Sequence, residues 1–410
     1  MGEILFLAHR VPFPPDRGDK IRSHHLLRGL AGIAPVHVGT FADTPGDREQ
    51  EAVLSNVAAS HLVVSRKKPM ALAGLEALAT GRPVSLTAFA DRRLHEWVAR
   101  TLAERPIDTI FVFSGQMGQY VPDDFPGRVI VDLCDADSAK FGTYAQTAAW
   151  PRSALLRRED RLLREEEARL AERADKTLLI TAQEKGLFAS RLPDPGDARL
   201  AALGNGIDAN FFDPAYAGEE PTIAARKGPH IVFTGQMDYP PNVAAALRGI
   251  ARILPLVRRR FPEAEFHVVG RAPARELAAH DGRDGVTIWG EVVDVRPFLL
   301  AAAVVIAPLD LARGVQNKVL EAMAMCRPVV ASEEAATGIA ATDGTHFAIA
   351  RSDAQMAEEI VALIEDGAKA RRMGRMARGF VLREYSWASV HEELRRIVGA
   401  DANRSGRDAA

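Results

Sequence analysis

The stretch Val304–Ser332, VVIAPLDLARGVQNKVLEAMAMCRPVVAS, decides the fold because two short buried strands flank a loop and a helix. The β-branched run at 304–307 predicts the first strand, and Val329–Ala331 predicts the second. Between them a helix is expected to begin near Gln316, with apolar side chains along its buried side. This order of elements is typical of a parallel sheet covered by helices.

The same alternation extends along the whole chain and predicts the α/β class, with two doubly wound, Rossmann-like domains. The clearest helix runs from Ser153 to about Ala174, where leucines recur every seven residues and Arg and Glu form a solvated face. The segment Asp353–Val398 also reads as helices. The expected strands are Ile4–Ala8, Val36–Phe41, His61–Val64, Thr109–Phe113, Val129–Leu133, Thr177–Ile180, Ile231–Thr234, Glu265–Val269, Thr287–Trp289, Val304–Ala307 and Val329–Ala331.

Turn and breaker residues between Leu203 and Gly228 mark a domain boundary, since this segment shows no periodicity. We therefore expect a first domain at 1–204, a linker at 205–228 and a second domain at 229–384. A C-terminal helix and tail at 385–410 complete the chain, and this helix is a candidate to pack back on the first domain.

Composition and charge exclude several classes of protein. The 410 residues suit two domains, and a hydrophobic share of 47% leaves little room for long disordered segments. With 52 basic and 54 acidic residues the net charge is −2, and no basic segment predicts nucleic-acid binding. The two cysteines, Cys134 and Cys326, exclude a disulfide framework and a cysteine-rich zinc site. The longest apolar stretch, Phe298–Ala307, is too short for a membrane span, and the N-terminus does not resemble a signal peptide, so a cytoplasmic location is expected.

Two common ligand motifs and one catalytic motif are missing from the strand ends, where open α/β sheets bind ligands. The glycines near Gly204 and Gly235 do not complete a dinucleotide fingerprint, and no Walker lysine motif is present. Phe113 stands where the nucleophile elbow of a serine hydrolase needs a glycine. A dehydrogenase and a serine hydrolase are therefore disfavoured.

The helix after Arg313 and Gly314 is a candidate anion site, because a helix N-terminus with adjacent cations attracts phosphate. Lys318 supplies a cation, and Glu321 lies three residues further on and could accept two hydroxyls of a ribose. The spacing alone leaves open that Lys318 and Glu321 form an ordinary surface ion pair.

The stretch Pro308–Ser332 resembles the donor-binding signature of GT-B glycosyltransferases of family 4. The resemblance implies that Glu321 holds the nucleotide ribose, while Arg313 stands where the family has its first glutamate. Further similarity lies in Asn205-Gly206-Ile207-Asp208, in Phe233-Thr234-Gly235 and in His267-Val268-Val269-Gly270, so that nearly the whole chain is covered. The GT-B fold, with its two domains facing a cleft, is thus the expected architecture.

A narrower resemblance is to sugar transferases of bacterial PEP-CTERM/exosortase exopolysaccharide systems. It is carried by AHRVPFPPDRGDKIRSHHLLRGLA from Ala8, VDLCDADSAKFGTYA from Val131 and FTGQMDYPPNV from Phe233. In these proteins the first loop faces the donor, and here Gly18 would let the backbone approach a ligand. Gln236 and Asp238 occupy the region of the family's usual cation pair, so Lys318 and Arg313 would replace it. The donor-binding residues expected are Gly18, Gly235, Gln236, Arg313, Gly314, Asn317, Lys318 and Glu321.

Three carboxylates follow a strand of the first domain at Asp132, Asp135 and Asp137. GT-B enzymes hold their diphosphate with cations and helix dipoles, so no metal is expected here. Asp132 is interpreted as capping or structural, and Asp135 is the candidate catalytic residue that touches donor sugar or acceptor hydroxyl. No cofactor is expected beyond a nucleotide sugar as co-substrate.

The resemblance implies a retaining hexosyltransferase of exopolysaccharide biosynthesis that works without a metal. Its partners would be a nucleotide-sugar donor and a glycan or lipid-linked acceptor, the latter placing the protein either free in the cytoplasm or peripheral to the inner membrane. Two alternatives stay open: a non-hydrolysing nucleotide-sugar epimerase with the same architecture, and an inactive nucleotide-sugar-binding protein.

Overall fold

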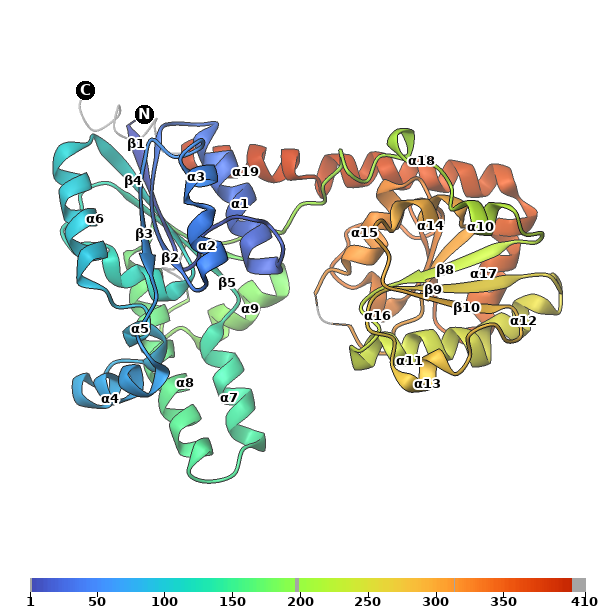
Figure 1. Cartoon of the computed structure of the whole chain (residues 1–410), viewed down its shortest axis with the longest axis horizontal. Coiled ribbons are helices and arrows are strands. Elements are labelled where there is room, and N and C mark those ends of the chain that lie inside the picture. Colours follow the sequence, from blue (N-terminus) through green and yellow to red (C-terminus); the bar gives the residue numbers. More distant parts are fainter. Residues whose placement is uncertain (1, 196–198, 313, 400–410) are drawn as a thin grey trace. The chain divides into compact units, whose positions relative to one another are not determined.

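The computed structural model describes residues 2–195, 199–312 and 314–399, which form two compact units (Figure 1). Unit 1 contains the chain up to Asn205 and the C-terminal segment from Val390 onward. Unit 2 is Gly206–Ser389. Each unit is built on its own parallel sheet and is described by itself below.

The sheet of unit 1 has the strand order β3-β2-β1-β4-β5-β6-β7, and all of its pairs are parallel. The order reverses direction at β1 and β4, which is the switch point of a doubly wound sheet. The strands are β1 Glu3–Ala8, β2 Val36–Ala42, β3 Ser60–Ser65, β4 Ile107–Phe113, β5 Arg128–Cys134, β6 Lys176–Leu179 and β7 Leu200–Ala202.

Helices cover both faces of this sheet, which buries its central strands completely. Leu5 and Leu7 of β1 pack in one cluster with Leu94 and Trp97 of α6, while the alternate residues of β1 point to the opposite face. The helices of unit 1 are α1 Gly18–Ala31, α2 Pro45–Glu49, α3 Glu51–Leu54, α4 Met70–Thr80, α5 Val84–Thr87, α6 Arg92–Glu104, η1 Gly115–Tyr120, α7 Asp137–Thr147, α8 Arg152–Arg173 and α9 Ala182–Arg191. The last part of α19, Trp387–Gly399, also belongs to unit 1 from Val390 onward, and its His391 approaches α1.

The sheet of unit 2 has the order β10-β9-β8-β11-β12-β13, again with parallel pairs throughout. Its switch point lies between β8 and β11, so a ligand is expected at the carboxyl ends of these strands. The strands are β8 His230–Thr234, β9 Glu265–Val269, β10 Val286–Gly290, β11 Val304–Ala307, β12 Val329–Ser332 and β13 Ala348–Ala350.

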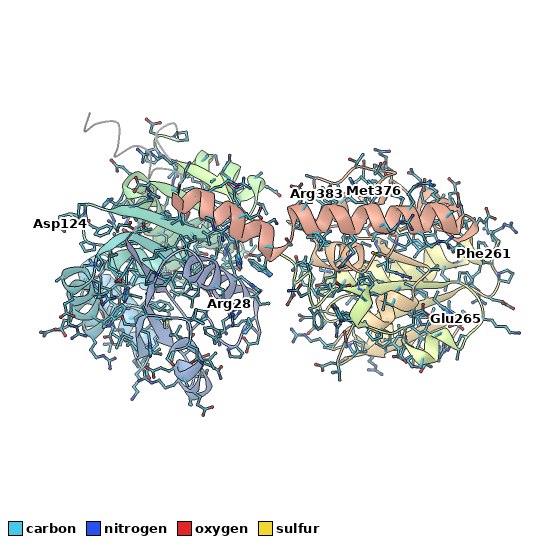
Figure 2. The ribbon with its side chains drawn as sticks, turned by 90° about the horizontal axis from the view of Figure 1, so that it is seen from above. Arg28, Asp124, Phe261, Glu265, Met376 and Arg383 are labelled. Carbon is cyan, nitrogen blue, oxygen red and sulfur yellow. The ribbon has the colours of Figure 1, made fainter. Side chains whose placement is uncertain are left out.

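The helices of unit 2 include the long α18, on which Figure 2 labels Met376 and Arg383. Its Gly374 lies against the backbone of Cys326, where an added Cβ would meet the carbonyl oxygen at 2.0 Å. The helical segments are η2 Pro214–Tyr216, α10 Pro221–Ala224, α11 Pro240–Arg248, η3 Gly249–Ile253, α12 Leu254–Arg258, α13 Arg275–Ala278, α14 Arg296–Ala301, α15 Asn317–Ala324, α16 Glu333–Ala336, α17 Asp353–Glu365 and α18 Gly367–Glu384.

The predicted fold class is confirmed, since both units are parallel, doubly wound α/β structures. Every predicted strand is present, with ends that differ from the prediction by at most two residues, and the predicted long helix is α8. The short edge strands β7 and β13 were not predicted, because three residues of Leu, Ile and Ala carry too little pattern.

Residues 206–228, expected as a linker, pack within unit 2 instead. Ile223 of α10 is fully buried in the core of this unit, and the amide of Ile207 donates to the carbonyl of Tyr385. Breaker residues thus mark an irregular segment here, not a free connection. None of the described helices is both long and apolar enough to cross a membrane.

Candidate functional site

A pocket of about 520 Å³ opens at the carboxyl edge of the unit 2 sheet. The loops after β8 and β9 form one side, and the start of α15 forms the other. The residues that line it are Thr234, Gly235, Gln236, Tyr239, Asn242, Val269, Gly270, Arg271, Glu291, Val292, Val295, Val315, Gln316, Asn317, Lys318 and Glu321. Five predicted donor-binding residues therefore share one pocket: Gly235, Gln236, Asn317, Lys318 and Glu321.

Two glycines at the ends of β8 and β9 let the loops of this pocket lie against each other. Gly270 has φ 154°, and a Cβ there would lie 1.6 Å from the carbonyl oxygen of Gly235. Gly235 has φ 157°, and a Cβ on it would come within 3.1 Å of the Lys318 ammonium. Side chains at either position would therefore collide with the pocket wall.

Lys318 projects from the first turn of α15 into the pocket. Its ammonium donates to Asn242 Oδ1 and lies 4.7 Å from the centre of the Phe233 ring. The Asn242 amide in turn donates to the carbonyl of Gln236 at 2.9 Å, so its orientation is held by the loop after β8. The Lys318 charge thus stands beside the N-terminus of a helix, whose first amides and dipole attract an anion.

Glu321 lies one turn further along α15, partly buried, and its side chain makes no hydrogen bond or ion pair within the part of the chain that the structure describes. Lys318 and Glu321 do not approach within ion-pair distance of each other in that part, so the interpretation as an ordinary surface ion pair is wrong. Burial raises the pKa of Glu321 to about 7, against the weaker influence of Lys318. Burial also lowers the pKa of Lys318 to about 8.

These two shifts predict a bell-shaped pH dependence for binding of a nucleotide sugar. The Glu321 carboxyl group accepts hydrogen bonds from hydroxyls more strongly, and with both oxygens, when it is ionised, so affinity should rise through about pH 7, whereas the Lys318 ammonium loses its charge as pH rises through about 8. Calorimetry with UDP-glucose, whose diphosphate is esterified at both ends, should show affinity rising about fivefold between roughly pH 6 and 7.5. Glu321→Gln should remove the acidic limb and keep the alkaline one. An acidic limb that persists in Glu321→Gln would assign it to another group.

Arg271 is a cation of this pocket that sequence reasoning missed. It follows Gly270, and its guanidinium donates to Gln236 Oε1 at 2.9 Å. The sequence signal that could have found it is a basic residue directly after the glycine that follows β9. At this position the chain continues from the end of the strand into the pocket. Gln236 was expected to stand where the family has a cation, and the structure places the cation Arg271 beside it. Arg271 and Lys318 together form the positive side of the pocket.

Arg313 lies outside the described residues, so its predicted role is not located by the structure. Gly314 has φ 66°, a left-handed conformation that glycine adopts without strain, and its carbonyl accepts from the Gln316 side chain at 3.1 Å. Gly314 does not line the pocket itself, whereas its neighbour Val315 does.

Gly18 and Asp135 belong to unit 1, whereas the pocket described above belongs to unit 2. Gly18 begins α1, and a Cβ there would meet open space, so no close approach within the chain requires a glycine. Asp135 follows β5 and pairs with the Lys140 ammonium at 2.9 Å. Asp132 is fully buried against Arg22, which confirms its structural interpretation.

The carboxyl end of β1 presents a histidine that the sequence did not single out. His9 is 8% exposed and stacks on Phe113, with ring centres 5.6 Å apart. Its Nε2 lies 3.4 Å from Asp19, and its Nδ1 is buried with no partner among the described residues. Hydrogen bonding to His9, followed by Arg10, holds the pKa of Asp19 well below its usual range. The charged groups at this edge of unit 1 are thus held in fixed orientations.

One cluster of potential metal ligands occurs among the described residues, formed by His230, Glu265 and His267 (Glu265 is labelled in Figure 2). The indole N–H of Trp289 donates to His267 Nδ1 at 3.2 Å, which places the proton of the neutral imidazole on Nε2, facing the cluster. Burial, with His230 as a smaller cause, lowers the pKa of His267 to about 3. His230 and Glu265 begin their strands, so the cluster lies at the edge opposite the pocket. The arrangement fits a neutral hydrogen-bonded network and does not offer His267 as a ligand.

Comparison with known proteins identifies what unit 2 is similar to. Residues 228–366 match the family model of "Glycosyl transferases group 1". The chain is 25% identical over 253 residues to the alpha-maltose-1-phosphate synthase of Mycolicibacterium smegmatis, which covers 55% of this chain and 63% of that protein. It is 27% identical over 203 residues to the phosphatidyl-myo-inositol mannosyltransferase of Mycobacterium tuberculosis, covering 47% of this chain and 52% of that one. The chain thus matches between half and two thirds of the length of these relatives.

Solved structures extend the likeness in fold to both units. Alr3699/HepE of Anabaena in complex with UDP has a TM-score of 0.65 at 16% identity, covering 97% of this chain and all of that one. Sucrose-phosphate synthase of Thermosynechococcus elongatus has a TM-score of 0.60 at 16% identity, covering both chains fully. The predicted GT-B fold of two Rossmann-like domains is therefore confirmed. Residues 228–366, which match the group 1 glycosyl transferase model, thus lie in a chain with this fold.

Proposed function

We propose that this protein is a glycosyltransferase that moves a sugar from a nucleotide-sugar donor to a glycan or lipid-linked acceptor. The observation that carries the proposal is the pocket of unit 2, where Lys318, Arg271 and the start of α15 surround a space beside the unpaired Glu321. It lies inside the segment that matches the group 1 glycosyl transferases. Three solved structures of the similar Alr3699/HepE contain UDP, UDP with glucose, or UDP-glucose.

The donor would be held by complementary charge and hydrogen bonding. The diphosphate fits the Lys318 ammonium, the Arg271 guanidinium and the free amides at the start of α15. The ribose hydroxyls fit the Glu321 carboxylate, which has no other partner among the described side chains. Gly235 and Gly270 leave the backbone open to the sugar or phosphate, and Asn317 lies at the pocket's edge. The resemblance of the sequence motifs is the only support for three further proposed donor-binding residues: Gly18, Arg313 and Gly314.

The reaction would be mainly positioning and stabilisation of the leaving group. The bond between the anomeric carbon and the diphosphate oxygen breaks, and the acceptor oxygen forms a new bond to the same face of that carbon. The acceptor's proton leaves with the nucleoside diphosphate. Lys318 and Arg271 would stabilise the charge that develops on the diphosphate, so no divalent metal is needed in this proposal. Asp135 stays the proposed contact to sugar or acceptor, held by Lys140.

The finer assignment rests on the resemblance of the sequence motifs. We propose a retaining hexosyltransferase of family 4, acting in exopolysaccharide synthesis of the PEP-CTERM type. Its acceptor would be a glycan or a lipid-linked glycan, reached from the cytoplasm at the inner membrane surface.

The test is a panel of nucleotide sugars, first for thermal stabilisation and then for transfer. A true donor at about 100 times its dissociation constant should add about 2.7 kcal/mol to the stability of the folded state. Transfer to an acceptor extract should release nucleoside diphosphate, survive a chelator, and give a product whose anomeric configuration by NMR equals that of the donor. Stabilisation without transfer to any acceptor would favour the inactive binding protein, and exchange of the sugar's C2 proton would favour the epimerase. Loss of transfer in chelator that manganese restores would contradict metal independence.

A further inference from the structure

On helix α4 of unit 1 the large apolar side chains face the solvent and the small ones face the protein core. Its small residues Ala73 and Ala77 are fully buried against the unit. Its large residues point outward, where Met70 is 58%, Leu72 53%, Leu75 64% and Leu78 60% exposed. Exposing apolar surface to water costs roughly 25 cal/mol per Å², so a row of exposed leucines on one helix indicates a binding surface.

A groove of about 690 Å³ lies along the same helix, between α4 and α8. Leu75 and Leu78 line it from α4, and Leu155 and Leu156 line it from α8. The two helices are joined where Arg158 donates to the carbonyl of Ala77 at 2.7 Å. The exposed leucines of α4 thus continue into the apolar wall of α8.

Two exposed aromatic residues lie at or near the turn between α7 and α8, and α8 also lines the groove. Trp150 is 82% exposed just before α8 begins, and Tyr144 near the end of α7 is 57% exposed. Trp and Tyr are the residues that prefer the boundary between hydrocarbon and water in a membrane. We call the set Met70, Leu72, Leu75, Leu78, Tyr144, Trp150 and Leu155 the apolar face.

The charges beside the apolar face are basic. Arg66, Lys67 and Lys68 precede α4, and Arg152 lines the groove. Lys67 and Arg152 are exposed and form no ion pair within the described ranges. The nearby acidic groups are occupied: Glu76 pairs with Lys68, and Glu159 accepts from the amides of Val84 and Ser85.

We propose that the apolar face is a docking surface for a bilayer of anionic lipid. Outward leucines, interfacial aromatics and unpaired cations together are the chemistry of a helix lying in the headgroup region. The exposed cations Lys67 and Arg152 favour an anionic lipid surface as the occupant, because each would face negatively charged headgroups. Docking would serve the proposed function, on which this role depends, because it would hold unit 1 at the membrane in which a lipid-linked acceptor is embedded.

The experiment is sedimentation of the full chain with vesicles of phosphatidylglycerol or of phosphatidylcholine. We expect strong binding to the anionic vesicles, weak binding to the neutral ones, and weakening in high salt. Leu72→Ser with Leu75→Ser should lower the partition coefficient about 10-fold or more, because two exposed leucines no longer enter hydrocarbon. Arg152→Glu should lower it by about 10-fold for the anionic vesicles. Met376→Ser, which changes an exposed methionine of α18 in unit 2 (Figure 2), is the matched control and should bind as the parent does.

Trp150 supplies a direct readout, since Trp97 and Trp387 are buried and Trp289 is partly buried. Brominated lipid should quench the fluorescence of the parent and leave that of Trp150→Phe nearly unchanged. Equal binding of the leucine variant and the parent would overturn the proposal. So would a dimer in solution that the leucine variant converts to monomer, because a second copy would then cover the face. Binding of UDP-glucose, measured without vesicles on the same variants, tests the proposed function separately.

Discussion

Replacing Lys318 by alanine is expected to weaken binding of UDP by about 30- to 100-fold. The ammonium projects from the first turn of α15 into the pocket, and Asn242 fixes its position. A hydrogen bond to a charged group contributes roughly 1.5–3 kcal/mol, and here the charge also neutralises an anion in a partly desolvated place. Calorimetry at pH 7.5 with UDP and with uridine separates the two halves of the ligand. Only the affinity for UDP should fall.

Lys227→Ala is the matched control, because Lys227 is an exposed lysine of the same unit outside the pocket. It should bind UDP as the parent does. Turnover in Lys318→Ala should fall at least as much as affinity, since the charge on the diphosphate grows as the sugar departs. Parent-like UDP binding in Lys318→Ala would place the diphosphate elsewhere and overturn the proposed orientation of the donor.

Replacing Arg22 by methionine is expected to lower the free energy of unfolding of unit 1 by about 3–5 kcal/mol. Arg22 is 1% exposed and donates to Asp132 Oδ2 at 2.9 Å and to the carbonyl of Leu203 at 2.8 Å. It also reaches Asn205 Oδ1 at 2.9 Å, so it ties α1, β5 and the segment after β7 together. The methionine keeps the volume but leaves the Asp132 carboxylate buried without its cation. Urea unfolding followed by fluorescence and circular dichroism measures the loss.

The double variant Arg22→Met with Asp132→Leu should recover part of that loss, because it removes the unpaired charge as well. Arg28→Met is a matched control, since Arg28 is an exposed arginine on the same helix α1. An Arg22→Met protein as stable as the control would show that the pair contributes nothing net.

Predictions from sequence succeeded where one local pattern determined the structure. Continuous β-branched runs such as 304–307 are typical of strands buried inside a parallel sheet, so the ends of these strands could be predicted closely. The heptad leucines and the charged face of α8 defined a helix of 22 residues to within one residue at each end. The placing of Lys318 and Glu321 on the first turns of one helix followed from the same periodicity.

Predictions were weaker where the outcome depended on contacts between distant segments. Asn242 contacts Lys318, and Arg271 contacts Gln236. The partners in each pair lie on different elements or loops, so no local pattern in the sequence predicts these contacts. Residues 206–228 carry every sign of a linker, yet Ile223 finds a place in the core of unit 2. Scattered apolar residues among breakers give no periodicity, so only packing against the rest of the unit reveals which of them are buried.

The sequence by itself determined the α/β class, the strands of both sheets other than the short edge strands β7 and β13, and the helix that carries Lys318 and Glu321, because short-range periodicity specifies each of them. Only the tertiary structure decided that, among the described residues, these two side chains form no ion pair with each other and that their pKa values are drawn toward neutrality, since burial depends on every element around the pocket. It also decided that α4 turns its alanines inward and its leucines outward. The sequence MALAGLEALAT is apolar on nearly every side, so the neighbours α5 and α8 select which side is buried.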